Sequence, residues 1–570
     1  MKNKKLRKKI SALAAVLLTA VMFIAAPGFT QRVYAEDIAI DATNFPDENF
    51  RTYISANADG NGDGVLSPEE ISSTTSINVR NKSISDLKGI EFFTSLTELN
   101  CYQNQLTSLD VSKNTALKNF ECDSNQLTSL DVSRNTALVF FSCTGNQLTT
   151  INMGSKPELI RFHCDSNNLS NIDMSQCTAL IGMSCAGNPL TSLDLSKCTR
   201  LQGLDVYETD ITSLDFSCNS ELVSLDCPGN RLTSLDLSNC TALENLDCRV
   251  NQLASLDLSN CTALKYLDCG DNQLASLDVS NCPALINLCC NNNSLKRLDL
   301  EANTSLSADN ATFDSQSGSV FAAYRGGKLA VDLANDVGLD MDKVSDVSVT
   351  GGTYSNGTAY FDIPVADEAK ISYSYSTKPS IQEKMDVTLI LSTVIVTFDT
   401  DGESAVELQA VEAGTSASRP AKPVKAGYHL IDWYTDPSCA DGTEFDFATP
   451  LTEDITLYAK WEEHTFGPWT HTGSHTHECT VCGYSETEEC TFGDWQVTKQ
   501  PTAADNGKKE RTCSKCGYVE TAEIAALGTT ASENSDIPQT GESGNAVLWA
   551  AMMLATAGAG LLTIRMRKER

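Results

Sequence analysis

The sequence predicts a mainly β protein organised around a solenoid of about 10 coils, each 21 residues long. Two observations lead to this prediction. Copies of one pattern begin every 21 residues from Leu106 to Leu274, and a 22-residue copy from Ile84 precedes them. Each copy also contains a short stretch in which apolar and polar residues alternate, as they do in a strand. Because each coil buries its apolar edge only against its neighbours, we expect a long exposed surface and no deep closed pocket.

The predicted solenoid spans residues 77–305, and the second half of each copy reads L-x-x-L-x-C-x-x-N. This is the leucine-rich-repeat frame with Cys in the last apolar position. We expect the recurring Asn to hydrogen-bond the backbone of successive coils. The recurring Cys suits a small buried residue that stacks well, with disulfides and metal binding as alternatives. The first half of each copy is similar, which predicts extended backs, a back row of Asp residues, and a nearly straight solenoid about 50 Å long.

The front of the solenoid should expose the residues that flank each inward Cys. Exposed aromatic and Arg side chains are favoured at binding hot spots. The candidate ligand contacts are the aromatic and basic residues of this face: Tyr102, Phe140, Arg161, His163, Tyr207, Arg249 and Tyr266. They predict a binding face for a protein or glycan whose identity the sequence does not give.

Residues 1–35 have the parts of a secretion signal: a basic start, an apolar run from Ile10 to Ala26, and small residues before a cleavage site after Ala35. Its removal takes seven positive charges from a chain whose net charge is already −32. So acidic a surface argues against nucleic acid and anionic membranes as partners, and is compatible with calcium-rich surroundings.

Residues 36–76 predict an EF-hand-like cap for the open end of the solenoid. The stretch DGNGDGVLSPEE (59–70) has oxygen ligands at the spacing of a calcium loop, and residues 46–58 can form the entering helix. The expected calcium ligands are Asp59, Asn61, Asp63, the carbonyl of Val65, Ser67 and Glu70. We expect weak binding of one calcium ion, at about 10⁻⁴–10⁻³ M, with a structural role.

Two small β domains are predicted after the solenoid. Residues 306–391 lose the period and alternate apolar with polar residues, which is typical of a β-sandwich. Residues 392–462 begin VIVTFDTDG and end ITLYAKW, and they resemble the Listeria–Bacteroides repeat module, a β-grasp-like surface domain. The segment departs from that family at GYHLIDWY (427–434). The resemblance implies a stalk or spacer.

Residues 463–527 contain two related Cys-rich units, each ending in a C-x2-C pair followed by Gly-Tyr. His464 of the first unit and Cys490 of the second stand in the same register. Such pairs have zinc-ligand character, although in an exported segment they can also oxidise to disulfides or remain free thiols. The candidate zinc ligands are His464, His477, Cys479, Cys482, Cys490, Cys513 and Cys516.

The C-terminus predicts attachment to a cell wall. Residues 528–540 are a polar linker with the start of a pentapeptide, and residues 541–570 contain an uncharged run (546–564) and a basic tail. The order resembles the LPXTG-type sorting signal of Gram-positive bacteria, in Ile537, Pro538, Gln539, Thr540 and Gly541. By resemblance, sortase cuts after Thr540 and links it to peptidoglycan, and the apolar run retains the chain in the membrane until then.

The repeats from Ile84 onward also resemble those of internalin-like bacterial surface proteins, over about residues 40–300. The chain holds six His and none of the common catalytic motifs (Gly-x-Ser-x-Gly, His-Glu-x-x-His or a phosphate loop), so we expect no catalysis. The sequence therefore predicts an extracellular, wall-anchored adhesin or recognition protein. A metal-collecting surface protein and a passive wall spacer are the alternatives.

Overall fold

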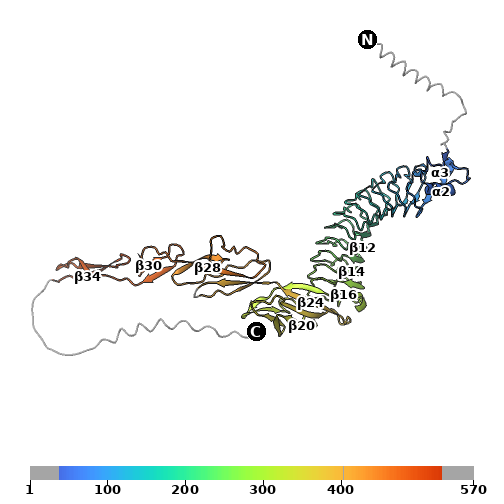
Figure 1. The fold of residues 1–570 in the computed structure, drawn as a ribbon. Helices are drawn as coiled ribbons and strands as arrows, with labels where there is room; N and C mark the ends of the chain where they lie inside the picture. The colour runs from blue at the N-terminus through green and yellow to red at the C-terminus, as the bar shows by residue number, and fades with distance from the viewer. Residues whose placement is uncertain (1–36, 402–403, 529–570) are drawn as a thin grey trace, which may run out of the picture. The chain divides into compact units, whose positions relative to one another are not determined.

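A computed structural model describes residues 37–401 and 404–528 (Figure 1). The predicted signal peptide (1–35), the sorting pentapeptide (537–541) and the apolar run (546–564) lie outside these residues. In the described part, no helix combines the length and apolar character that crossing a bilayer requires. The described residues fall into two compact units, and the second consists of residues 400–401, 404, 422–432 and 459–528.

The N-terminal cap is a helix–loop–helix element with a short two-stranded sheet. Its elements are β1 (Ile38–Ala39), α2 (Glu48–Asn57), β2 (Val65–Leu66) and α3 (Pro68–Ser73). The side chain of Asp47 caps α2 by accepting from the backbone N–H groups of Asn49 and Phe50. Helix α3 begins with a capping box between Ser67 and Glu70.

The cap packs directly on the first coil of the solenoid. Asp47 Oδ2 accepts hydrogen bonds from the backbone N and the Oγ of Ser85, at 2.8 and 2.9 Å. Gly89 has a φ of +102°, and a Cβ there would lie 2.4 Å from the ring of the buried Phe45. Only glycine permits this close approach, so the cap covers the apolar end of the solenoid through a tightly fitted contact.

The solenoid carries a parallel sheet of 12 strands whose spatial order follows the chain, which gives about 11 turns. The middle residue of these strands points inward and is buried, as at Leu204, Leu225 and Leu246. The front strands are β3 (Ser76–Asn78), β4 (Glu98–Asn100), β5 (Asn119–Glu121), β7 (Phe140–Ser142), β9 (Arg161–His163), β10 (Gly182–Ser184), β11 (Gly203–Asp205), β12 (Ser224–Asp226), β13 (Asn245–Asp247), β14 (Tyr266–Asp268), β15 (Asn287–Cys289) and β16 (Ala311–Thr312). The leucine-rich-repeat prediction is thereby confirmed. A 3-10 turn, η1 (Ile90–Phe92), lies in the first coil and another, η2 (Ala308–Asn310), precedes β16.

The back of the solenoid differs from the prediction. Among the described coils, β6 (Ser129–Asp131) and β8 (Thr150–Asn152) are the strands that pair on the back, and the other coils pass through turns. Most back Asp residues accept a hydrogen bond from the Ser two residues later, as from Ser238 N to Asp236 Oδ1 at 2.9 Å. Asp131 of β6 accepts the same bond from Ser133 N, so this bond is compatible with a ladder and does not explain its absence from the other described coils. The coils also follow an arc in Figure 1, so the expected straight ribbon is wrong.

The Asn ladder ties consecutive coils together. Asn125 Nδ2 donates to the carbonyls of Cys101 in the preceding coil and Cys122 in its own, at 3.0 and 3.1 Å. Its Oδ1 accepts from Leu106 N at 3.0 Å. The same pattern recurs along the solenoid, and Gln316 takes the place of Asn in the last coil. The expected hydrogen bonding between coils is therefore present.

A β-sandwich follows the solenoid, in two sheets of four strands ordered β17-β24-β23-β20 and β18-β19-β22-β21. Its buried faces join the apolar interior of the solenoid in one continuous core. The elements are β17 (Gln316–Val320), β18 (Ala323–Arg325), β19 (Lys328–Asp332), η3 (Met341–Lys343), β20 (Val344–Thr350), β21 (Gly352–Ser355), β22 (Thr358–Phe361), β23 (Lys370–Ser376) and β24 (Lys384–Leu391).

The C-terminal part contains one four-stranded sheet, ordered β26-β25-β28-β27, and two three-stranded sheets. The four-stranded sheet consists of β25 (Thr393–Asp399), β26 (Gln409–Glu412), β27 (Tyr428–Tyr434) and β28 (Ile455–Glu463). The two Cys-rich units each form one small antiparallel sheet, from β29 (Thr470–His471), β30 (His475–Glu478) and β31 (Ser485–Glu488), and from β32 (Gln496–Lys499), β33 (Gly507–Thr512) and β34 (Val519–Ile524).

Candidate functional site

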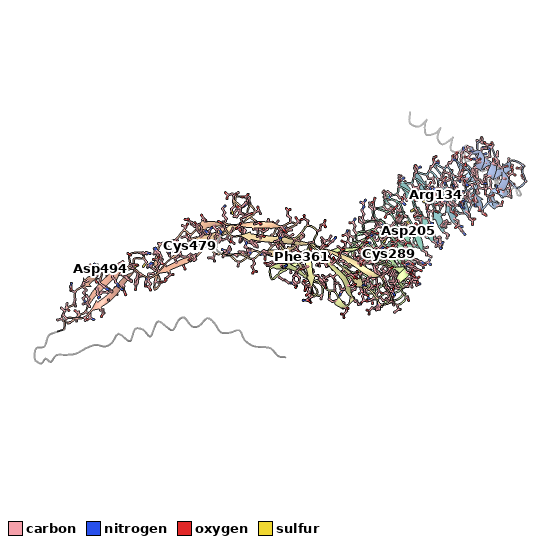
Figure 2. The ribbon with its side chains drawn as sticks, turned by 60° about the horizontal axis from the view of Figure 1, so that its bottom comes forward. Arg134, Asp205, Cys289, Phe361, Cys479 and Asp494 are labelled. Atoms are coloured by element: carbon pink, nitrogen blue, oxygen red, sulfur yellow. The ribbon has the colours of Figure 1, made fainter. Side chains whose placement is uncertain are left out.

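The front face of the solenoid is a regular surface in which the first and third residues of each short strand form rows. Strands pair residue by residue, so that Asp205 on β11 lies opposite Asp226 on β12. Figure 2 shows Asp205 on this part of the chain. The interior behind the face is filled by buried Leu, Phe and Cys side chains. A ligand can therefore contact side chains on a rigid surface but cannot enter the coils.

The first half of the front face carries an aromatic and basic group. Phe140 on β7 is the register neighbour of Arg161 on β9, and the Phe140 and His163 rings meet edge to face at 5.6 Å. Behind them, the buried rings of Phe120 and Phe141 stack at 5.4 Å. These predicted contacts thus lie together, over an interior that holds the strands firmly.

The second half of the front face carries an acidic row that the sequence analysis did not single out. Asp205, Asp226, Asp247 and Asp268 occupy the third position of four successive strands. Burial, followed by the charge of Asp205, raises the pKa of Asp226. The signal was available in the sequence, because these residues precede the inward Cys or Val in successive copies.

Two further predicted contacts border the acidic row. Arg249 lies 3.5 Å from Asp247 and 3.3 Å from Asp268. The Tyr266 side chain is 47% exposed, and it lines a shallow depression of about 220 Å³ together with Asp226, Asp247 and Asp268. This depression combines an exposed aromatic ring with several carboxylates.

Of the remaining predicted contacts, Tyr102 lies apart from these two groups, and Tyr207 borders the acidic row, because its backbone N donates to Asp205 Oδ1 at 3.0 Å. Tyr102 on the first coils is covered by the guanidinium of Arg80, 4.6 Å from the ring centroid. The Tyr207 hydroxyl donates to Glu208 Oε1 at 2.6 Å. The seven predicted contacts are thus spread along most of the solenoid and do not form one patch.

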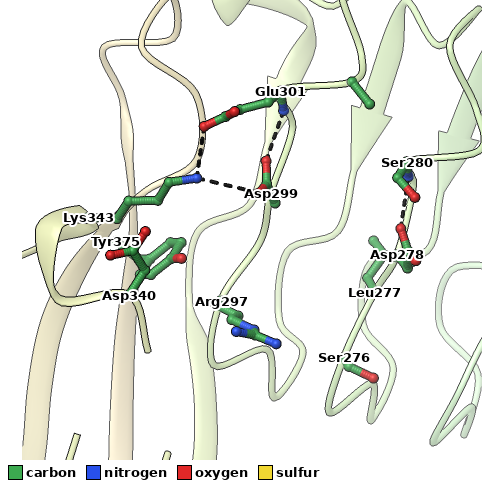
Figure 3. A pocket seen from close by; sticks show the side chains of 11 residues that line it. Ser276, Leu277, Asp278, Ser280, Arg297, Asp299, Glu301, Asp340, Lys343 and Tyr375 are labelled. Carbon is green, nitrogen blue, oxygen red and sulfur yellow. Dashed lines mark hydrogen bonds and ion pairs between the residues drawn. The ribbon is translucent and has the colours of Figure 1, made fainter. Parts of the chain in front are cut away.

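A separate pocket of about 620 Å³ lies where the last coils meet the β-sandwich (Figure 3). Lys343 reaches from the sandwich to Asp299 and Glu301 of the last coil, at 3.4 and 3.0 Å. Arg297 Nη1 also donates to the carbonyl of Gly338 at 2.8 Å. These contacts hold the sandwich on the solenoid.

In the predicted calcium loop, backbone donors already satisfy several of the proposed ligands. Asp59 accepts from Gly62 N at 2.6 Å and Gly64 N at 3.0 Å, and Glu70 Oε1 accepts from Gly60 N at 2.8 Å. The carboxylates of Asp59, Asp63 and Glu70 are not among the described groups whose ligand atoms lie within 4.8 Å of one another. Calcium binding stays a prediction.

Two groups of four His and Cys side chains lie in the C-terminal part. In each group, the ligand atoms all lie within 4.8 Å of one another. The first group, called the first cluster, consists of His429, His464, Cys479 and Cys482. The second group, called the second cluster, consists of His475, Cys490, Cys513 and Cys516. Figure 2 labels Cys479 of the first cluster.

Both C-x2-C pairs lie in the same kind of tight turn. Cys479 N donates to the carbonyl of Tyr484, and Gly483 N donates back to the carbonyl of Cys479, at 2.7 and 3.0 Å. The second unit repeats both bonds, between Cys513 and Tyr518 and between Gly517 and Cys513. Burial opposes ionisation of Cys479, but nearby backbone N–H groups and the His464 ring outweigh it and lower the pKa of the thiol to about 6. These turns therefore favour the thiolate form that binds metals.

Six of the seven zinc candidates from the sequence lie in one or the other cluster, and the sequence analysis missed two histidines that also belong to them. His477 is in neither cluster, since its ring stacks on Trp469 at 3.6 Å and its Nε2 lies 3.3 Å from Glu486 Oε2. His429 and His475 were missed because each belongs to the domain before its cluster. His429 stands in the GYHLIDWY segment, whose departure from the family pattern was the available signal.

Comparisons with known proteins agree with this architecture. Residues 395–460 match the family model of the Listeria–Bacteroides repeat domain. Internalin J of Listeria monocytogenes serotype 4b is 41% identical over 71 residues, which are 12% of this chain and 8% of Internalin J. The matched stretch therefore covers a small part of that relative's length.

Solved structures of internalins are also similar to the chain. The functional domain of Internalin J, described as including a cysteine ladder, is 26% identical with a TM-score of 0.43, over 63% of this chain and 99% of that domain. The internalin InlF of Listeria monocytogenes is 24% identical with a TM-score of 0.41, over 49% of this chain and 92% of InlF. The chain is thus similar to internalins, and its residues 395–460 match the Listeria–Bacteroides repeat domain.

Proposed function

We propose that this protein is a wall-anchored surface protein that recognises a protein or glycan through the front face of its solenoid. The observation that carries the proposal is the combination of a fully packed interior with exposed rows on the 12-stranded sheet. Such a surface has no enclosed site for a small substrate. It offers a long, preorganised area for contacts with a large ligand, so that little conformational entropy is lost on binding.

Two parts of the front face are suited to anchor a ligand. Phe140 and Arg161 lie side by side on adjacent strands, and Tyr266 borders the acidic row beside Arg249. Aromatic and Arg side chains are enriched at hot spots because they bury a large area and bond directionally. We assign recognition to one or both of these groups, and no catalytic role.

The support for anchoring to the wall is the C-terminal sequence: the pentapeptide, the apolar run and the basic tail. Sortase would cleave between Thr540 and Gly541, and Thr540 would become the covalent link to peptidoglycan. Protein released by muramidase should then end at Thr540 and carry a wall fragment, as mass spectrometry would detect. Release of a chain that still ends in the basic tail would overturn this part of the proposal.

The calcium loop would stabilise the cap and leave ligand recognition to the solenoid. Helices α2 and α3 flank the loop, and β2 within the loop pairs with β1, so a bound ion would hold both helices against the first coil. Isothermal titration should show one weak site, with a Kd of about 10⁻⁴–10⁻³ M. The site should be lost in Asp63→Ala, which removes an oxygen ligand, and unchanged affinity in that variant would contradict the assignment.

Binding should be tested with the full chain against a panel of host surface proteins, mucins and glycans. The first variant replaces Phe140 and Arg161 with Ala, and the second replaces Arg249 and Tyr266. If a group is a hot spot, its loss should weaken binding by about 2 kcal/mol or more, roughly 30-fold.

Arg134→Ala combined with Lys197→Ala is the matched control, because both residues are exposed on the back of the solenoid. The control should bind like the wild type. Binding that both front-face variants retain, together with a loss in the back variant, would overturn the front-face proposal. If the full chain binds no member of the panel, the passive-spacer alternative is favoured.

A further inference from the structure

The two clusters are built on one plan. Each takes three ligands from its own Cys-rich unit and one histidine from the domain before it. In the first cluster, His429 comes from β27 of the Listeria–Bacteroides repeat domain. In the second cluster, His475 comes from β30 of the first Cys-rich unit, while all three cysteines belong to the second unit. The same connection is thus made twice along the chain.

The spacing of the ligand atoms fits a tetrahedral zinc ion. Cys482 Sγ and His464 Nδ1 lie 3.4 Å apart in the first cluster, and Cys513 Sγ and His475 Nδ1 lie 3.7 Å apart in the second. Cys490 Sγ and Cys516 Sγ are separated by 4.0 Å. With Zn–N and Zn–S bonds of about 2.0 and 2.3 Å, tetrahedral ligand atoms are separated by about 3.3–3.8 Å. A disulfide would need about 2.0 Å between sulfur atoms.

The histidine that the preceding domain contributes to the first cluster is buried without a hydrogen-bond partner among the described residues. His429 is 8% exposed, and neither of its ring nitrogens has a hydrogen-bond partner in the described part of the chain. Its Nε2 has Glu462 Oε2 at 3.7 Å, beyond hydrogen-bond distance. Leaving a buried imidazole without a polar partner destabilises the folded chain. A metal ion bound to His429 removes this penalty.

His475 shows the arrangement expected of a zinc ligand with outer support. The side chain is fully buried, its Nδ1 faces Cys513 Sγ, and its Nε2 lies 3.4 Å from Glu488 Oε2. A carboxylate on the far nitrogen orients a metal-binding imidazole and increases its basicity. Lys515 in turn contacts Glu488, so the carboxylate is held in place.

We propose that the two clusters are structural zinc sites, and that each zinc ion fastens one domain to the next. Four protein ligands complete the tetrahedral shell and leave no position for water or substrate, which is typical of structural sites. The first zinc would join the Listeria–Bacteroides repeat domain to the first Cys-rich unit. The second would join the two Cys-rich units, so that the three domains form a metal-linked array.

Metal content of the full chain, purified anaerobically, is the first test. The wild type should contain two zinc ions, and His429→Ala and His475→Ala should each contain one. His477→Ala is the matched control, because His477 is a histidine of the same sheet that lies outside both clusters. Absence of zinc from the reduced wild type, or two ions in both the His429 and His475 variants, would overturn the proposal.

A second variant keeps the test decisive if an alanine variant fails to fold. His429→Cys replaces one zinc ligand with another and converts the first cluster to the His–Cys₃ composition of the second. After replacement of zinc by cobalt, this variant should keep two ions, and its thiolate-to-cobalt absorption should increase. A spectrum identical to that of the wild type would show that residue 429 is not a ligand.

Hydrogen exchange tests the fastening of domains separately from metal binding. Zinc should slow amide exchange in β27 of the wild type, and this protection should be lost in His429→Ala but retained in His475→Ala. Protection of β30 should show the reverse dependence. If β27 exchanges equally fast with and without zinc while two ions are bound, the zinc sites do not link the domains.

Discussion

Cysteine serves two different purposes in the solenoid and in the Cys-rich units. In the solenoid, the ladder cysteines are buried in stacked rows, and burial raises the pKa of Cys240, Cys261 and Cys282 to about 11. In the Cys-rich units, cysteines converge with histidines in tight turns, and the pKa of Cys479 and Cys513 is lowered to about 6. The contrast shows that burial favours the neutral thiol in the solenoid, whereas backbone N–H donors in the C-x2-C turns favour the thiolate of Cys479 and Cys513.

The sharpest way to separate the two kinds of cysteine is to remove the metal. A zinc-selective chelator, added to the reduced protein, should unfold the Cys-rich units, because binding at such a site contributes about 10–16 kcal/mol to folding. Alkylation followed by mass spectrometry should then label five new thiols: Cys479, Cys482, Cys490, Cys513 and Cys516.

The solenoid supplies the controls for this experiment. Cys218 is exposed and should be alkylated with or without chelator, while the buried ladder cysteines should stay protected in both conditions. If the ladder cysteines became reactive on chelation, metal would be stabilising the solenoid as well, and the distinction between the two regions would be lost.

A buried lysine interrupts the back ladder of cysteines and asparagines. Lys156 occupies the position that holds Cys177 in the next coil and Asn135 in the preceding one. It is fully buried, and its Nζ donates to the carbonyls of Val132 and Met153. Asn135 Nδ2 donates to the carbonyl of Val111 in the same manner, at 2.9 Å. We expect Lys156→Asn to increase the free energy of unfolding by about 1–3 kcal/mol at neutral pH, because it removes a buried charge.

The pH dependence of this effect has a defined sign. Burial lowers the pKa of Lys156 from 10.5 to about 8, so the unfolded chain binds more protons than the folded chain between these values. The stability of the wild type should therefore rise relative to the variant from pH 8 to 10.5, and the advantage of Lys156→Asn should shrink over that range. Chemical denaturation at several pH values measures both quantities. A constant difference would show that the ammonium group is not the source.

The smallest effect is expected for an apolar replacement within the front ladder. Val206 already fills the Cys position in one coil and is fully buried there. Cys248→Val should change the free energy of unfolding by less than about 1.5 kcal/mol, as volume-conserving core substitutions do. Cys479→Val should instead abolish one zinc site. A large loss of stability in Cys248→Val, measured by denaturant titration, would mean that the ladder thiols do more than pack.

The sequence predicted the repeating part of the fold well, because its physics is local. The period of 21 residues places Leu, Cys and Asn in the same environment in every coil, so their burial and hydrogen bonding follow from the pattern. The back of the coil was predicted wrongly. There, apolar alternation predicted strands, but it does not determine whether the backbones of adjacent coils come close enough to hydrogen-bond.

The metal-binding residues were predicted only as far as spacing within a unit allows. The C-x2-C pairs can be recognised from the sequence, because both cysteines belong to one turn. His429 is 50 residues before Cys479, and only folding brings them together. His475 and His477 are two residues apart on β30 and so point to the same face, where both rings contact Trp469, and the sequence does not say which of the two reaches the next unit.

The forward donation of a histidine gives the array a direction and an end. His475 stands four residues before the first Cys of its C-x2-C pair and packs edge to face on Trp469 at 4.5 Å. In the last unit, Lys509 stands four residues before Cys513, and its ammonium group lies over the ring of Trp495 at 4.7 Å. A lysine in this place has no imidazole to offer a successor. By this proposal the second Cys-rich unit is the terminal member of the metal-linked array: it accepts a histidine ligand from the first unit, and at the equivalent position it has a lysine that cannot serve as the ligand for a further unit.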